Sequence, residues 1–166
     1  VACAEAGIFP SISLAAYYKP NGPIDYHRLV DGLLAFRNAR GNSDYFFAMF
    51  SGNVANNALI KILKAAGVKF LEITIHWGEY DLDKFLQDID NLRNQGFTVM
   101  LKAMEFNRNT ALPSRNGTLF PHFDIIELKG NRGAGPIGSQ SLEEMFFITK
   151  HQFPDKQLVA TGGIHL

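Results

Sequence analysis

Short apolar runs and longer amphipathic segments alternate along the chain. The short runs have the length of buried strands, whereas the longer segments carry apolar residues every three or four positions, as helices do. Six strands are predicted, at Ile8–Ala15, Tyr45–Ser51, Val68–His76, Phe97–Met104, Phe123–Lys129 and Gln157–Thr161. Four helices are predicted between them, capped by Asp25, Asn53, Asp81 and Ser141. Segment 107–122, which contains two prolines and an Asn-Gly pair, is predicted to be mostly loop. The alternation predicts a parallel sheet built from βαβ units.

The polar residues within the predicted strands decide between two architectures. In three strands one face is apolar, whereas the other face carries Glu72, Lys102 and Glu127. An open sheet covered by helices on both faces would be apolar throughout. We therefore predict an α/β fold of the (β/α)8 TIM barrel type, with the polar side chains directed toward the lumen. On neighbouring strands these three residues would form a row of acid, base and acid, which is either part of a functional site or a structural ion network.

The length of the chain limits how much of a barrel it can form. A complete barrel has eight strands and usually ~250 residues, whereas this chain has 166 residues and six predicted strands. We therefore expect residues 1–166 to form one incomplete barrel domain, as a fragment of a longer chain. The composition is 46% hydrophobic and 19% charged, which is typical of a globular protein and excludes a disordered one.

Charge and cysteine content exclude several classes of function. The 16 basic residues balance 16 acidic ones, so the whole chain offers no electrostatic attraction to nucleic acid or to an anionic membrane. No apolar run approaches the length of a transmembrane helix. Cys3 is the single cysteine, which excludes an internal disulfide, and the histidines lack metal-ligand spacing. We expect a cytoplasmic protein without a metal site.

Two glycine-rich segments follow predicted strands. Residues 130–138 follow the fifth strand, and Gly162–Gly163 follow the sixth. Both segments would lie at the carboxyl-terminal face of the sheet, where exposed backbone N–H groups can bind phosphate. The sequence therefore predicts an anionic ligand or cofactor at this face.

Four stretches together resemble the nitronate monooxygenase, or 2-nitropropane dioxygenase-like, group of FMN-dependent (β/α)8 barrels, which includes flavin-dependent enoyl reductases. The four stretches are Val1–Gly7 (VACAEAG), Ala65–Lys69 (AAGVK), Phe123–Gly130 (FDIIELKG) and Leu158–Ile164 (LVATGGI). The resemblance implies an FMN-dependent oxidoreductase with a small-molecule substrate. It places Lys129, Gly130, Gly133, Ala134 and Gly135 near the flavin, and Gly162 and Gly163 at its phosphate. We also expect either a homo-oligomer or a place in a larger multidomain chain.

One position departs from the family pattern. Pro136 stands where the family's glycine loop usually continues into a histidine that acts as a base, and proline cannot move a proton. The candidate catalytic residues are therefore His76, at the end of the third predicted strand, and Lys102. His76 could equally be an ordinary histidine at a strand end.

Two other functions fit the same residues. A phosphate-binding barrel lyase or isomerase could use Lys102 as a Schiff-base lysine and Glu72 or Glu127 as acid or base. A catalytically degenerate barrel domain of a multidomain synthase would explain Pro136. Among the other histidines, His27 and His151 are predicted to lie at the surface, and His122 is predicted to lie in a loop without a partner.

Overall fold

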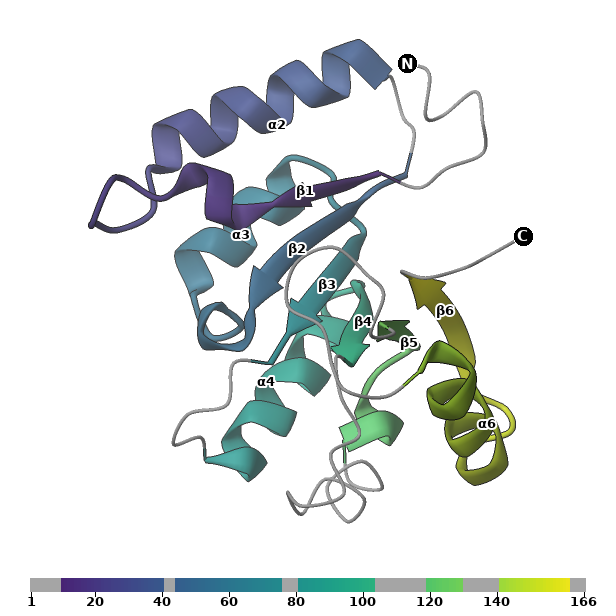
Figure 1. The fold of residues 1–166 in the computed structure, drawn as a ribbon. Helices are drawn as coiled ribbons and strands as arrows, with labels where there is room; N and C mark the ends of the chain where they lie inside the picture. The colour runs from purple at the N-terminus through teal and green to yellow at the C-terminus, as the bar shows by residue number, and fades with distance from the viewer. Residues whose placement is uncertain (1–9, 41–43, 76–80, 104–118, 130–140, 162–166) are drawn as a thin grey trace.

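The sheet of the protein is parallel and follows the order of the chain. The computed structural model describes residues 10–40, 44–75, 81–103, 119–129 and 141–161. The strands are β1 (Ser11–Ser13), β2 (Phe46–Phe50), β3 (Phe70–Thr74), β4 (Thr98–Ala103), β5 (Ile125–Lys129) and β6 (Gln157–Thr161). Each strand pairs in parallel with the next, in the order β1-β2-β3-β4-β5-β6 (Figure 1). A doubly wound sheet would reverse its order part-way, so the observed order is that of a partial barrel.

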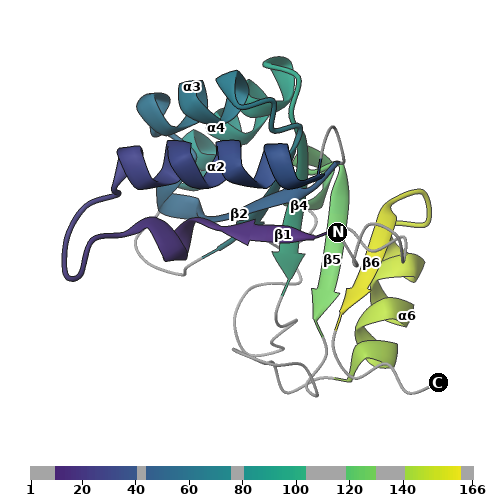
Figure 2. The ribbon, with the colours of Figure 1, turned by 90° about the horizontal axis from the view of Figure 1, so that it is seen from above.

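Helices cover one face of this sheet. They are α2 (Tyr26–Arg40), α3 (Asn57–Ala65), α4 (Leu82–Asn94) and α6 (Leu142–Gln152), with short 3-10 turns at η1 (Leu14–Tyr17), η2 (Ser51–Asn53) and η3 (Phe120–His122). Figure 2 shows α2, α3 and α4 side by side on one face, with α6 beside β6. Within the described residues β6 does not pair with β1, so both strands are sheet edges.

The helix ends follow the predicted signals with one correction. The side chains of Asp81 and Ser141 accept hydrogen bonds from the backbone N–H three residues on, as helix caps do. Gly67 and Gly96 follow α3 and α4 with φ of +79° and +92°, a conformation that favours glycine. The prediction that Asn53 caps α3 is wrong, because the cap is a different asparagine.

Asn56 takes that role, since its side chain accepts from the backbone N–H of Leu59 at 3.1 Å. Asn53 ends η2, and its side chain accepts instead from the hydroxyl of Tyr18 at 3.2 Å. The first strand is also shorter than predicted, because the chain turns into η1 at Leu14. The turn η3 occupies the end of the segment predicted as loop, most of which lies outside the described residues.

The two faces of the sheet differ as the strand pattern predicts. On the face toward the helices, Leu71 lies opposite Val99, and Leu101 lies opposite Ile126, all of them buried in one hydrophobic core. Full burial of such a side chain contributes about 1.5–3 kcal/mol. The opposite face, here called the inner face, carries Glu72, Lys102 and Glu127. The core therefore fixes which side chains of each strand point away from the helices.

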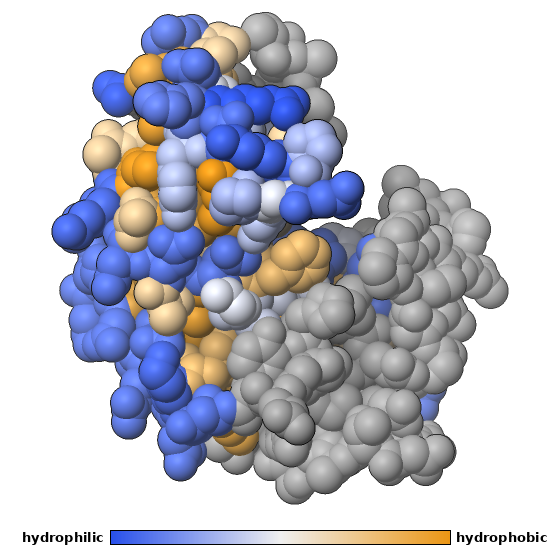
Figure 3. Space-filling model, turned by 90° about the vertical axis from the view of Figure 1, so that its left-hand side faces the viewer, coloured by the Kyte–Doolittle hydropathy of each residue, from blue (hydrophilic) through white to orange (hydrophobic). Residues whose placement is uncertain are grey.

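Large exposed apolar side chains occur on two helices, those nearest the sheet edges, and at Phe50, the last residue of β2. Among the described residues, α2 exposes Val30 and Leu34, and α6 exposes Phe146 and Phe147, whereas α3 and α4 expose none. On the side of the molecule seen in Figure 3, apolar residues form small areas among polar ones. The exposed aromatic pair on α6, with its rings 6.2 Å apart, is therefore an unusual surface feature.

Replacing Phe147 by lysine is expected to reduce self-association of the chain. The residue is 72% exposed, so the free energy of unfolding should change by less than about 0.5 kcal/mol. Light scattering against concentration measures the association, and urea unfolding measures the stability. Phe147→Leu, which keeps the apolar character, is the control and should associate like the wild type. Equal association of Phe147→Lys and wild type would show that this surface is not responsible.

Candidate functional site

A lysine between two glutamates is the central feature of the inner face. Lys102 on β4 lies opposite Glu127 on β5 and opposite Thr74 on β3, and Glu72 is two residues before Thr74 on the same face. The Lys102 Nζ lies 2.8 Å from Oε1 of Glu72 and 3.1 Å from Oε1 of Glu127. The predicted row of acid, base and acid is confirmed, because parallel pairing in this register brings the three side chains together.

Two hydroxyl groups extend this row toward the sheet edges. Thr161 on β6 donates from Oγ1 to Oε1 of Glu127 at 2.8 Å. Ser11 on β1 donates from Oγ to Oε2 of Glu72 at 3.5 Å, a weak contact that crosses β2. The small side chain of Ala48 stands at the β2 position opposite Glu72. The resulting inner-face row comprises Ser11, Glu72, Lys102, Glu127 and Thr161.

The row is largely shielded from water. Glu72 is 7% exposed and Glu127 is 3% exposed, whereas the Lys102 side chain keeps 21% of its surface exposed. Burial by itself lowers the pKa of Lys102, but its hydrogen bond to Glu72 and the negative charges of Glu127 and Glu72 together raise that pKa above its usual value. Lys102 is therefore an ammonium at neutral pH, a hydrogen-bond donor and counter-charge rather than a nucleophile.

One oxygen of the row has no partner. Oε2 of Glu127 is buried and makes no hydrogen bond within the part of the chain that the structure describes, whereas Oε1 accepts from both Lys102 and Thr161. An ammonium has three hydrogens, and only the two carboxylates accept from Lys102 among the described residues. A buried acceptor without a donor costs about 1–3 kcal/mol. Within the described residues, the row thus contains a buried acceptor without a donor and an ammonium with one hydrogen that has no acceptor.

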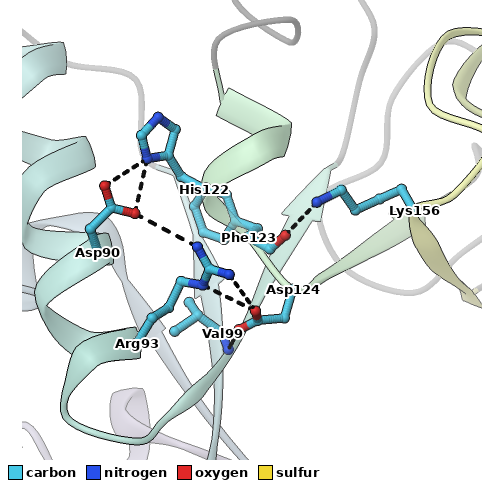
Figure 4. Close-up of polar contacts among 7 residues, drawn as sticks. All are labelled: Asp90, Arg93, Val99, His122, Phe123, Asp124 and Lys156. Carbon is cyan, nitrogen blue, oxygen red and sulfur yellow. Dashed lines mark hydrogen bonds and ion pairs between the residues drawn. The ribbon is translucent and has the colours of Figure 1, made fainter.

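A second polar cluster lies at the opposite, amino-terminal end of the strands (Figure 4). The prediction that His122 has no partner is wrong, because its Nδ1 lies 3.0 Å from both carboxylate oxygens of Asp90 on α4. Arg93 binds Oδ1 of Asp124 through two nitrogens, at 2.9 and 3.0 Å, and Oδ2 of Asp124 accepts from the backbone N–H of Val99 at 2.8 Å. Both carboxylates therefore hold α4 against the start of β4 and β5.

This cluster borders a surface hollow of about 610 Å³ lined partly by Asp90, Arg93 and Asp124. Beside it, burial and then the positive charge of Arg93 lower the pKa of Lys156, whose ammonium donates to the carbonyl oxygen of Phe123 at 2.8 Å. Contacts at the amino-terminal face of a barrel serve stability, whereas ligands bind at the carboxyl-terminal face. We therefore assign the cluster a structural role.

Of the predicted site residues, the structure describes the two lysines. Lys102 lies in the inner-face row, and Lys129 is the buried last residue of β5, opposite Thr161 on β6. The other predicted site residues lie outside the described residues: His76, Gly130, Gly133, Ala134, Gly135, Gly162 and Gly163. Pro136 lies there as well. His27 and His151 are exposed, as predicted.

Sequence reasoning missed Ser11 and Thr161. The period-two pattern of each strand could have placed both hydroxyls on the inner face, but only the register shows that they reach the glutamates. Within the described part of the chain, no three His, Cys, Asp or Glu side chains are grouped as metal ligands. Of the helices described, none is long and apolar enough to span a membrane.

Comparison with known proteins supports the fold. No family model matches the chain, and no curated protein matches it. Among solved structures, a FabK mutant from Thermotoga maritima matches with a TM-score of 0.67 at 16% sequence identity. The match covers 98% of this chain and 48% of the FabK chain, so this chain spans about half the length of that protein. The shared feature is the fold, a TIM barrel of which this chain shows six parallel strands.

Removing the ammonium is expected to destabilise the protein strongly. Lys102→Met leaves two buried carboxylates without their counter-charge, which should lower the free energy of unfolding by about 3–5 kcal/mol in urea titrations at neutral pH. Lys69→Met is the matched control. Lys69 pairs with Asp44 at 3.0 Å at the surface, where side-chain exposures are 66% and 39%, so its loss should cost less than about 1 kcal/mol. Similar costs for the two variants would contradict the assigned role of Lys102.

The raised pKa of Lys102 predicts a loss of stability in alkali. In the unfolded chain the group titrates near 10.5, and in the folded protein it titrates higher. Its contribution is therefore fully present below about pH 10.5 and is lost as the pH rises through the folded-state pKa. The difference in unfolding free energy between wild type and Lys102→Met should shrink above that pH. A constant difference up to about pH 12 would contradict this linkage.

Proposed function

We propose that this protein is an FMN-dependent oxidoreductase of the nitronate monooxygenase or enoyl-reductase type, acting on a small-molecule substrate. The observation that carries the proposal is the inner-face row, in which Lys102 and Thr161 lie at or near the carboxyl ends of their strands. Lys102 is the last residue but one of β4, and Lys129 and Thr161 end β5 and β6. Barrel enzymes bind their ligands at this end. The likeness of the fold to FabK supports the same placement.

The residues of the row fit a flavin ring. The polar edge of the ring carries carbonyl oxygens beside one ring N–H, which are acceptors beside a donor. The row offers a donor to such an oxygen, since among the described residues the Lys102 ammonium has two acceptors for its three hydrogens and its side chain keeps 21% of its surface exposed. The family resemblance assigns the phosphate to the glycines that follow β5 and β6, which lie outside the described residues.

The chain's own residues would bind and orient the reactants. FMN, when bound, would supply two-electron redox chemistry. Lys102 would donate a hydrogen bond to a ligand oxygen and stabilise negative charge there, and Glu72 and Glu127 would hold its ammonium in place. Because Pro136 replaces the usual base of the family, His76 is the residue we propose to move the substrate proton.

The environment of Lys102 disfavours the lyase or isomerase alternative. A Schiff base needs a neutral amine, whereas the two glutamates raise the pKa of Lys102. A phosphate beside the row would also meet two carboxylates and one ammonium. The degenerate-domain alternative predicts the same inner face without flavin affinity, so flavin binding distinguishes it from the proposal.

Flavin absorbance is expected from the chain after incubation with FMN and desalting. Bands between about 350 and 500 nm should remain with the protein. Lys102→Met should bind FMN about tenfold more weakly, since it loses a charge-assisted hydrogen bond, whereas Lys69→Met should bind like the wild type. Absence of bands for the wild type at saturating FMN would refute the proposed function and favour the degenerate domain.

A further inference from the structure

We propose that the exposed face of α6 is a homodimer interface, in which the α6 helices of two copies pack antiparallel across a twofold axis that passes beside Phe147. The occupant of this face is therefore a second copy of the same chain. Figure 2 places α6 beside β6 at one edge of the molecule, with its outer face uncovered. The inference does not depend on the proposed function, because that site lies on the inner face of the sheet.

Two exposed aromatic side chains mark this face of α6. Phe147 is 72% exposed, the largest value for any large apolar side chain among the described residues, and Phe146 is 40% exposed. On the other side of the helix, Met145 and Thr149 are fully buried. The two aromatic side chains are thus not what holds α6 on the sheet. Burying them against a partner would remove a large apolar area from water.

The polar residues around Phe147 are arranged symmetrically. Glu143 lies four residues before Phe147 and His151 lies four residues after it, and all three side chains are exposed. Residues four apart on a helix share one face, about 6 Å apart along the axis. When two such helices pack antiparallel with Phe147 next to its own copy, Glu143 of each protomer lies opposite His151 of its partner. The face therefore complements itself, as a twofold interface requires.

Glu143 and His151 are both available for such contacts. Within the described part of the chain, neither side chain makes a hydrogen bond or an ion pair. Lys150, in contrast, donates to the carbonyl oxygens of Pro154 and Lys156, both at 3.0 Å. Glu143 and His151 also suit the dipole of their own helix, but this does not account for the exposed ring between them. Packing against a second copy accounts for the ring and for the two polar residues together.

The arrangement predicts a dimer that does not grow further. A twofold contact uses the same face of both copies, so no α6 face is left for a third copy. The face of one helix is smaller than a standard protein interface, so we expect dissociation at about micromolar concentrations. Sedimentation equilibrium of the full chain between about 1 and 200 µM should therefore show monomers and dimers only.

Mixing two charge variants tests the antiparallel pairing. In a Glu143→Lys homodimer the introduced lysine faces His151, and in a His151→Glu homodimer the introduced glutamate faces Glu143. Each variant alone should therefore dimerise at least about tenfold more weakly than the wild type. In an equimolar mixture the introduced lysine faces the introduced glutamate, and the remaining Glu143 faces the remaining His151. The mixture should form heterodimers with about the wild-type dissociation constant, measured with a fluorescent label on one variant.

A matched charge reversal outside this face serves as the control. Asp83 is exposed in the first turn of α4, as Glu143 is in the first turn of α6. Asp83→Lys should leave dimerisation unchanged, and its mixture with His151→Glu should not reach the wild-type dissociation constant. Because all the replaced side chains are exposed, the variants should fold like the wild type, which circular dichroism and urea unfolding check.

The results of these measurements either support the interface or overturn it. Wild-type dimers, weakened homodimers of both charge variants and restored heterodimers together support it. A wild type that stays monomeric at the highest concentration would overturn it, and so would assemblies larger than a dimer, which indicate a head-to-tail contact. Charge variants that dimerise like the wild type, or a mixture without restored affinity, would also overturn it. None of these results bears on FMN binding, so the two proposals can fail separately.

Discussion

The inner face depends on the contact between the Lys102 ammonium and two carboxylates from neighbouring strands. Burying Glu72 and Glu127 without a cation would cost several kcal/mol for each charge. Both carboxylates are tolerated because Lys102 lies within 3.1 Å of each. The contact in turn requires the observed register, since a shift of one residue would turn Lys102 into the apolar core. The ion contacts of Lys102 therefore favour this register of the strands, and the register in turn makes these contacts possible.

The polar cluster at the amino ends of the strands stabilises the fold, whereas the inner-face row is the candidate functional site. At the amino ends of the strands, Arg93, Asp90 and His122 pair with one another or with Asp124, and both carboxylate oxygens of Asp124 have partners. On the inner face, Glu127 at the middle of β5 keeps an acceptor that no donor of the described residues satisfies. Proteins accept such local cost at functional sites. This contrast supports the choice of the row as the site.

The sequence predicted the sheet and the central row because both follow from alternation within single strands. In each strand the residues just before and after the charged one are apolar, so the sequence alone shows that Glu72, Lys102 and Glu127 share the other face. Contacts between distant segments were not readable. His122 contacts Asp90, 32 residues away, and Asn53 accepts a hydrogen bond from the Tyr18 hydroxyl, 35 residues away, whereas Asn56 caps α3. For the same reason, the contacts of Ser11 and Thr161 with the glutamates could be identified only once the register of the strands was known.

Thr161 connects the inner-face row to a strand at the edge of the sheet. β6 pairs on one side only within the described residues, and none of its residues is fully buried. Edge strands open locally at lower free energy than the strands between them. Each opening of β6 breaks the Thr161 bond and leaves Oε1 of Glu127 to Lys102 alone. Amide hydrogens of β6 should therefore exchange with solvent faster than those of β4, which pairs with a strand on each side.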